Sequence, residues 1–240
     1  MRLVQPHLPA ALVCLILISG HSIHVRAQTT AVADGGDSAI QIRVLCSQPV
    51  EGVTELRLVQ DDAVLHELSL IPAMVSDPIG IGRGALVLAR KGGEAGEHNP
   101  VLEVPIPDAG RRFILALFPT PNDDPGNPYQ HILIRTDDLR FGVSDLYLFN
   151  LTGTPIGGAL GTKTFTLAPG KSEVVTPVPA SRDDPMYQAR LYHMTDAGQR
   201  LFSDTRWPLA ASARVYLFFV ADPRRRTITY VSFREYAPFE

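Results

Sequence analysis

A repeated stretch constrains the fold of this chain more than any other feature of its sequence. Residues 38–52, SAIQIRVLCSQPVEG, align without a gap with residues 144–158, SDLYLFNLTGTPIGG, and serine, leucine, proline and glycine coincide at four positions. In both copies apolar residues recur at every second position, which is the pattern of a half-buried β-strand. The sequence therefore predicts two similar β-domains.

Further landmarks recur in the same order along the two halves. The tripeptide LIP at 70–72 resembles LAP at 167–169, and RFILALF at 112–118 resembles RVYLFFV at 214–220. Residues 113–118 of the first heptapeptide, FILALF, are apolar on both faces, which predicts a central strand. The halves also differ in one connection. The first half has a long loop at 119–128, where the second half has a tight turn at 221–225.

Short strands separated by frequent turns, and the lack of a long amphipathic helix, predict an all-β protein. We expect two tandem antiparallel β-sandwich (Ig-like) domains, at 38–142 and 143–240, which meet near 141–144. With 45% apolar and 20% charged residues in 240, the chain is long enough for two such cores. One larger sandwich or barrel is the alternative.

The first 27 residues predict an export signal. Arg2 gives a positive start, residues 10–18 form the apolar run AALVCLILI, and Ala27 ends a stretch suited to cleavage. An uncleaved anchor is the alternative, but a membrane-spanning helix needs about 20 apolar residues. We expect cleavage after Ala27, a flexible leader at 28–37, and a secreted or periplasmic mature protein without a membrane span.

The mature chain has a mildly acidic composition and one cysteine. Removal of Arg2 and Arg26 leaves 20 basic and 25 acidic residues, which gives no electrostatic reason to bind nucleic acid or an anionic membrane. Loss of Cys14 leaves Cys46, which cannot form an intramolecular disulfide. No histidine or methionine lies near Cys46 in the sequence, so we interpret it as a buried thiol and predict no cofactor.

Acidic and basic turns offer candidate sites. Asp123 and Asp124 lie in a loop, and loop carboxylates suit calcium, although Asp-Pro pairs are also ordinary turn formers. Arg224, Arg225 and Arg226 form a basic hairpin tip that could hold a carboxylate, a phosphate or a sulfated sugar. The alternative is a solvated turn that protects a sheet edge.

The second half is rich in aromatic residues, and an exposed row of them could stack on sugar rings. This hypothesis predicts that Trp207 and at least two tyrosines, such as Tyr187 and Tyr192, are coplanar and exposed. The alternative is that these rings fill the sandwich core. Asn150-Leu151-Thr152 also matches the N-glycosylation pattern, although it lies in a predicted strand.

No catalytic motif is found in the sequence. It contains no Gly-x-Ser-x-Gly elbow, and the glycine run at 80–84 precedes a predicted strand instead of the helix that a phosphate loop requires.

We therefore expect a non-enzymatic structural, adaptor or binding protein with an unknown protein or glycan partner. The alternatives are a carbohydrate or cell-surface binding module and an enzyme whose site is built from loops. Tyr147 and Phe149 replace Gln41 and Arg43 of the first copy. If the two copies have different functions, we expect the difference to involve these positions.

Overall fold

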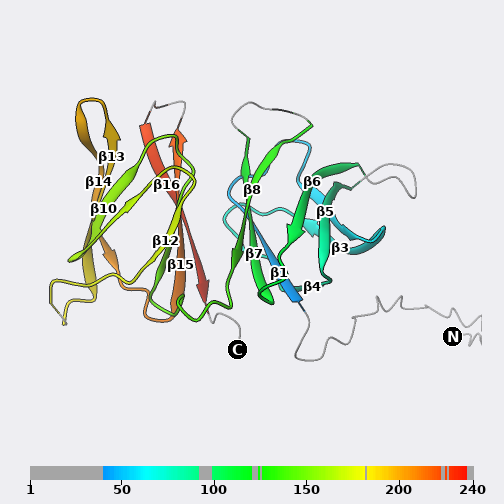
Figure 1. The fold of residues 1–240 in the computed structure, drawn as a ribbon, viewed down its shortest axis with the longest axis horizontal. Helices are drawn as coiled ribbons and strands as arrows, with labels where there is room; N and C mark the ends of the chain where they lie inside the picture. The colour runs from blue at the N-terminus through cyan, green and yellow to red at the C-terminus, as the bar shows by residue number, and fades with distance from the viewer. Residues whose placement is uncertain are drawn as a thin grey trace, which may run out of the picture. The chain divides into compact units, whose positions relative to one another are not determined.

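The computed structural model describes residues 40–91, 99–120, 124, 126–181, 183–222, 225 and 227–236. These residues form sixteen β-strands and no helix, which confirms the predicted all-β class (Figure 1). The strands are β1 (Ile40–Cys46), β2 (Glu55–Gln60), β3 (Ala63–Ser69), β4 (Ile79–Ile81), β5 (Gly84–Arg90), β6 (Pro100–Ile106), β7 (Arg112–Pro119), β8 (Tyr129–Arg135), β9 (Leu146–Asn150), β10 (Ile156–Leu160), β11 (Lys163–Leu167), β12 (Ser172–Val175), β13 (Met186–Thr195), β14 (Gly198–Pro208), β15 (Ala213–Asp222) and β16 (Thr227–Tyr236). The predicted signal peptide and leader lie outside the described residues.

The first eight strands form a sandwich of two four-stranded sheets. One sheet has the order β4-β1-β7-β8 and the other the order β3-β2-β5-β6. Their inner faces share one apolar core, in which Ile42, Leu58, Leu88 and Leu115 have no exposed surface. Each such side chain contributes about 1.5–3 kcal/mol by leaving water, so the alternating apolar residues hold the two sheets together.

The last eight strands repeat this plan. Their sheets have the orders β12-β9-β15-β16 and β11-β10-β13-β14, so each strand takes the place of the strand eight positions earlier. A second core, which includes Leu148, Ile156, Leu191 and Phe219, lies between these sheets. The predicted pair of tandem sandwiches is therefore the observed architecture.

Each sandwich contains one parallel strand pair, which the sequence interpretation did not include. β1 runs parallel to β7, and β9 runs parallel to β15, whereas the other named pairs are antiparallel. Side chains alternate between faces in both kinds of ladder, so the period-two pattern does not distinguish them.

The parallel ladders also correct the alignment of the two copies. When the RFILALF and RVYLFFV strands are matched, Phe113 corresponds to Val215, and their ladder partners Ile42 and Leu146 correspond as well. The ungapped alignment pairs Leu146 with Ile40 instead, two residues away. A two-residue shift leaves every side chain on its original face, so the apolar alternation cannot reveal it.

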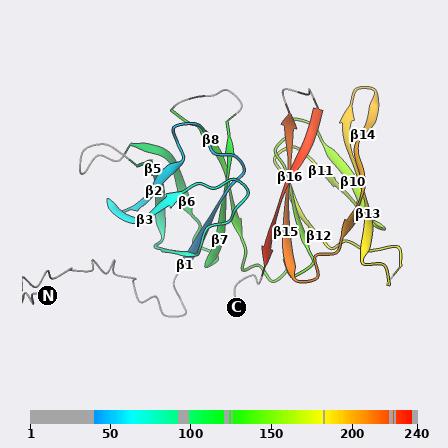
Figure 2. The same cartoon turned by 180° about the vertical axis from the view of Figure 1, so that it is seen from behind.

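β7 and β15 are buried on both faces because the two sandwiches pack against each other. Ile114, Ala116 and Phe118 of β7 meet Tyr216 and Phe218 of β15 in a third apolar cluster. The rings of Phe118 and Phe218 are 4.8 Å apart. Both views show the sheet of β7 and β8 beside the sheet of β15 and β16 (Figure 1, Figure 2). The prediction of a central strand at 113–118 is confirmed, and the third cluster explains its second apolar face.

The side chains that distinguish the first strands of the two copies lie in this interface. Tyr147 and Phe149 pack against the third cluster. Arg43 reaches across to Glu235, with 3.4 Å between Nη1 and Oε1. The Glu235 side chain is only 1% exposed, and it also accepts a hydrogen bond of 2.6 Å from the Tyr216 hydroxyl. These differences therefore build the contact between the sandwiches.

The predicted domain boundary falls in the connector at 136–145, which is bonded to the second sandwich. The Arg214 guanidinium donates a hydrogen bond of 2.6 Å to the Thr136 carbonyl oxygen. The Ser144 amide donates to the Ala213 carbonyl oxygen at 2.9 Å. The connector is thus fixed by backbone and side-chain bonds to the second sandwich.

Candidate functional site

A groove of about 650 Å³ opens at one end of the second sandwich. The β9–β10 loop, the β13–β14 hairpin and the β15–β16 hairpin surround it. Its lining consists of Thr154, Pro155, His193, Met194, Thr195, Asp196, Ala221, Asp222, Thr227 and Ile228. Its volume falls within the range of about 300–1,000 Å³ that is usual for small-ligand sites.

The β9–β10 loop is short and is held by Asn150 at the end of β9. The Asn150 amide nitrogen donates to the carbonyl oxygens of Thr154, at 2.9 Å, and Leu167, at 3.1 Å. Its amide oxygen accepts from the Thr152 backbone N–H and hydroxyl, at 2.9 and 2.7 Å. Asn150 is fully buried, so the Asn-x-Thr pattern fixes this loop and does not present a glycosylation acceptor at the surface.

The same end of the first sandwich is closed. Tyr129 at the start of β8 accepts a hydrogen bond of 2.7 Å from the Val50 amide and donates one of 3.1 Å to the Val53 carbonyl oxygen. Val53 is only 2% exposed, so the β1–β2 loop is drawn in between the sheets. Burial raises the pKa of Tyr129 to about 12, which keeps its hydroxyl protonated and able to donate.

Two differences between the copies leave the second sandwich open. Tyr129 pairs with Pro119 in the first sandwich, and the equivalent pair in the second sandwich is Ile228 with Ala221. Ile228 therefore takes the place of Tyr129, and it has no hydroxyl with which to hold a loop. The connection between the first two strands has eight residues in the first sandwich, 47–54, and five in the second, 151–155. The shorter loop is bonded to its own strand by Asn150, and its residues Thr154 and Pro155 line the groove.

The groove combines an apolar surface with several hydrogen-bonding groups. Ile228, Pro155 and Met194 supply apolar surface, whereas hydroxyl, carboxylate and imidazole groups supply polar contacts. The His193 ring lies 6.2 Å from the Phe202 ring, and the Thr195 hydroxyl donates to the Gly198 carbonyl oxygen at 2.8 Å. This arrangement suits contact with a ligand that has both apolar and polar parts.

Arg225 of the predicted basic hairpin tip contacts Asp222, which lines the groove. Arg225 is 83% exposed, its backbone N–H donates to Asp222 Oδ1 at 3.1 Å, and its Nε lies 3.8 Å from Asp222 Oδ2. Arg224 and Arg226, which were predicted to act with it, lie outside the described residues.

The aromatic residues of the second sandwich do not form the predicted platform. Tyr187 is only 4% exposed, and its ring is inclined at 75° to that of Trp207. Trp207 also meets Tyr230 at 63° and packs against the second core. Tyr192 is half-buried and pairs with Leu201 across the ladder. The expectation of coplanar, exposed rings is therefore wrong for Tyr187 and Trp207, because edge-to-face packing at the sandwich edge orients them.

The acidic loop at 119–128 shows turn chemistry at the residue that the structure describes. The Asp124 carboxylate accepts a hydrogen bond of 2.9 Å from the Gly126 amide, whereas Asp123 lies outside the described residues. Among the residues that the structure describes, no three His, Cys, Asp or Glu side chains are grouped to hold a metal ion.

Cys46 is buried, in agreement with its interpretation as an apolar thiol. Burial raises its pKa to about 11, so the reactive thiolate is disfavoured at neutral pH. Burial also lowers the pKa of His131 on β8.

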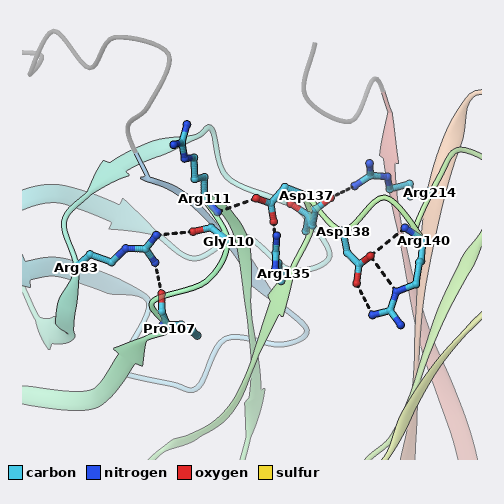
Figure 3. Close-up of polar contacts among 10 residues, drawn as sticks. Arg83, Pro107, Gly110, Arg111, Arg135, Asp137, Asp138, Arg140 and Arg214 are labelled. Carbon is cyan, nitrogen blue, oxygen red and sulfur yellow. Dashed lines mark hydrogen bonds and ion pairs between the residues drawn. The ribbon is translucent and has the colours of Figure 1, made fainter.

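Arginines gather at the end of the first sandwich where the β6–β7 loop and the connector lie (Figure 3). Arg83 donates to the carbonyl oxygens of Pro107 and, at 2.8 Å, Gly110. Asp137 accepts from Arg135 Nε at 2.6 Å and from the Arg111 backbone N–H at 2.8 Å. These contacts join the β4–β5 turn, the β6–β7 loop and the end of β8.

Comparison with known proteins finds no protein family that matches the chain and no similar sequence among curated proteins. In the described part of the chain no helix is long and apolar enough to cross a membrane.

The sequence interpretation missed the groove because its residues come from three separate connections. A detectable sign was present in the aligned copies, where the second has a shorter first loop and Ile228 in place of Tyr129. The arginine end was missed because Arg83, Arg111 and Arg135 are distant in sequence.

Proposed function

We propose that this chain is an exported, non-enzymatic binding protein, and that the groove at the end of its second sandwich is the ligand site. The observation that carries this proposal is the difference between two otherwise equivalent ends. Tyr129 and a longer loop close one, whereas Ile228 and a shorter loop leave the other open. Loops at the end of a rigid β-scaffold are common binding sites.

Contact binding, as opposed to catalysis, fits the chemistry of the lining. His193 lies beside the Phe202 ring, and the Thr195 hydroxyl is engaged with a backbone carbonyl. A nucleophilic mechanism needs a hydroxyl or thiol within hydrogen-bond reach of a base. The partner is a protein or a glycan segment small enough to enter the groove, and the export signal at residues 1–27 supports its encounter outside the cytoplasm.

The groove can be tested by filling it. Peptides selected from a displayed random library on the mature protein, and glycans bound on an array, are retested with Ile228→Trp, which puts a large ring into the groove. Thr229→Trp is the matched control, because Thr229 is the next residue of β16, is exposed and does not line the groove.

We expect ligands of the wild type to lose affinity for Ile228→Trp and to keep it for Thr229→Trp. Selected ligands that bind Ile228→Trp as tightly as the wild type would show that the groove is not the site. Turnover of an ester, glycoside or peptide substrate that Ile228→Trp abolishes would show that the site is catalytic.

A further inference from the structure

Three arginines surround Gly110 at one end of the first sandwich (Figure 3). Arg83 comes from the turn before β5 and bonds to the Gly110 carbonyl oxygen at 2.8 Å. Arg111 follows Gly110 in the chain, and Arg135 ends β8. A Cβ atom at Gly110 would lie 2.8 Å from Arg135 Cδ, so the glycine lets the Arg135 side chain pass against the loop.

Two of these guanidinium groups are held in position before any ligand arrives. Arg83 is fixed by the carbonyl oxygens of Pro107 and Gly110, which orient it without neutralising its charge. Arg135 is oriented by Asp137, with 2.6 Å between Nε and Oδ1. Side chains that are already ordered lose less conformational entropy on binding.

The end carries an excess of positive charge. Arg111 is exposed, and its guanidinium has no partner among the residues that the structure describes. The arginines at this end are Arg83, Arg111, Arg112, Arg135 and Arg140, and the aspartates of the β6–β7 loop and the connector are Asp108, Asp137, Asp138 and Asp145, which leaves an excess of one positive charge. The chain as a whole has a net charge of −3, so this end stands out from an acidic remainder.

We propose that this arginine end binds an anionic polysaccharide, with Arg83 and Arg111 as its main contacts. Planar guanidinium groups match carboxylate and sulfate oxygens. The charges lie on separate elements around an exposed loop, so several anionic groups spaced along a narrow chain fit them better than one enclosed anion. A broad polyanion such as a membrane or duplex would also face the acidic remainder of the protein.

A peptide ligand is less well suited to this end. Peptides gain affinity from apolar pockets or from pairing with a sheet edge, in addition to charge. Two pockets are found, one lined by residues between 44 and 77 of the first sandwich and one by residues between 154 and 228 of the second, and neither lining includes Arg83, Arg111 or Arg135. An acidic peptide would depend on charge alone here, so it serves as the competing outcome of the test.

The experiment is a titration of the mature protein with a size-defined heparin dodecasaccharide, a neutral dextran of similar length and poly-L-glutamate, each followed by calorimetry at low and at moderate salt. We expect binding of the dodecasaccharide that weakens with salt, and no binding of dextran. Arg111→Gln should weaken it by about tenfold, the equivalent of one charge-assisted hydrogen bond, and Arg111→Glu by more.

Arg200→Gln and Arg200→Glu are matched controls, because Arg200 is an exposed arginine on β14 of the second sandwich. They make the same charge changes and should alter the affinity less than about twofold. Equal losses in the Arg111 and Arg200 variants, or no binding of the dodecasaccharide, would overturn the proposal. Tighter binding of poly-L-glutamate than of the sugar would also overturn it and would assign the end to an acidic protein.

Discussion

Replacement of Glu235 by alanine tests how the two sandwiches are held together. The Glu235 carboxylate is 1% exposed and lies between the sandwiches, 3.4 Å from Arg43 of the first and 4.0 Å from Arg214 of the second. It also accepts a hydrogen bond from the buried Tyr216 hydroxyl. The substitution removes the carboxylate and leaves the two partly buried guanidinium groups of Arg43 and Arg214 without this anion.

Breaking a buried ion pair by removal of one partner costs about 3–5 kcal/mol. With a denaturant slope of about 2 kcal/mol per molar urea, the unfolding midpoint should fall by about 2 M. Glu235→Gln keeps the shape and an acceptor for Tyr216 but loses the charge, so its midpoint should lie between those of the wild type and Glu235→Ala.

The assay is urea unfolding of the mature protein, followed by far-ultraviolet circular dichroism and by the fluorescence of Trp207. Asp138→Asn is the control, because the Asp138–Arg140 pair lies at the surface of the connector and Arg140 is 87% exposed. Its midpoint should stay close to that of the wild type.

A double-mutant cycle with Arg43→Met isolates the contact that crosses the interface. The two substitutions together should cost less than the sum of their separate effects, because Arg43→Met removes a cation that Glu235→Ala leaves unpaired. A midpoint for Glu235→Ala that matches Asp138→Asn, or additive effects in the cycle, would refute the reasoning.

Three further predictions concern single side chains. Tyr129→Phe should lower the unfolding free energy by about 1–3 kcal/mol, measured by urea unfolding, because it leaves buried backbone groups without a partner. Gly161→Ala should destabilise the protein more than Gly170→Ala, measured by thermal unfolding. Both glycines have positive φ, 65° and 69°, but only at Gly161 would a Cβ collide with a backbone carbonyl oxygen. Between pH 9 and pH 11 the wild type should lose more stability than Cys46→Ala, because burial raises the folded-state pKa of this thiol to about 11 while the unfolded thiol ionises near 9.

Much of the fold could be predicted from the sequence because it depends on local patterns. The alternating residues of β1 and β9 predict strands, and RFILALF is apolar on both faces because β7 contacts a core on each side. The two-residue shift between the copies could not be predicted, since it leaves Ile42 and Leu146 on inward faces.

The environment of polar and aromatic residues that a strand pattern places on the solvent face was harder to predict. Arg43 alternates with apolar residues, as a solvent-facing residue does, yet that face of β1 meets the second sandwich. Tyr187 and Trp207 lie on neighbouring strands whose register includes a bulge at Leu191 and Tyr192. The angle between these rings depends on this pairing and on the contacts at the sandwich edge. The alternation of apolar and polar residues along one strand predicts neither of them.

The candidate sites depend on residues that are distant in the sequence. The groove is lined by residues of three connections and their flanking strands, at 154–155, at 193–196, and at 221–222 with 227–228. Only the first connection shows its difference from the other copy as a change of length and of bonding. The arginine end likewise unites residues 83, 111 and 135 through loop contacts that no local motif encodes.

The most direct test of the central claim is an amide chemical-shift titration of the mature protein with the tightest ligand from the peptide and glycan selections. We predict that the perturbed amides cluster at Thr154, Met194 and Thr227, which line the groove. The amides of Val50 and Val53, at the closed end of the first sandwich, should stay unchanged. Perturbations that cluster away from the groove, with Thr154, Met194 and Thr227 unmoved, would contradict the account.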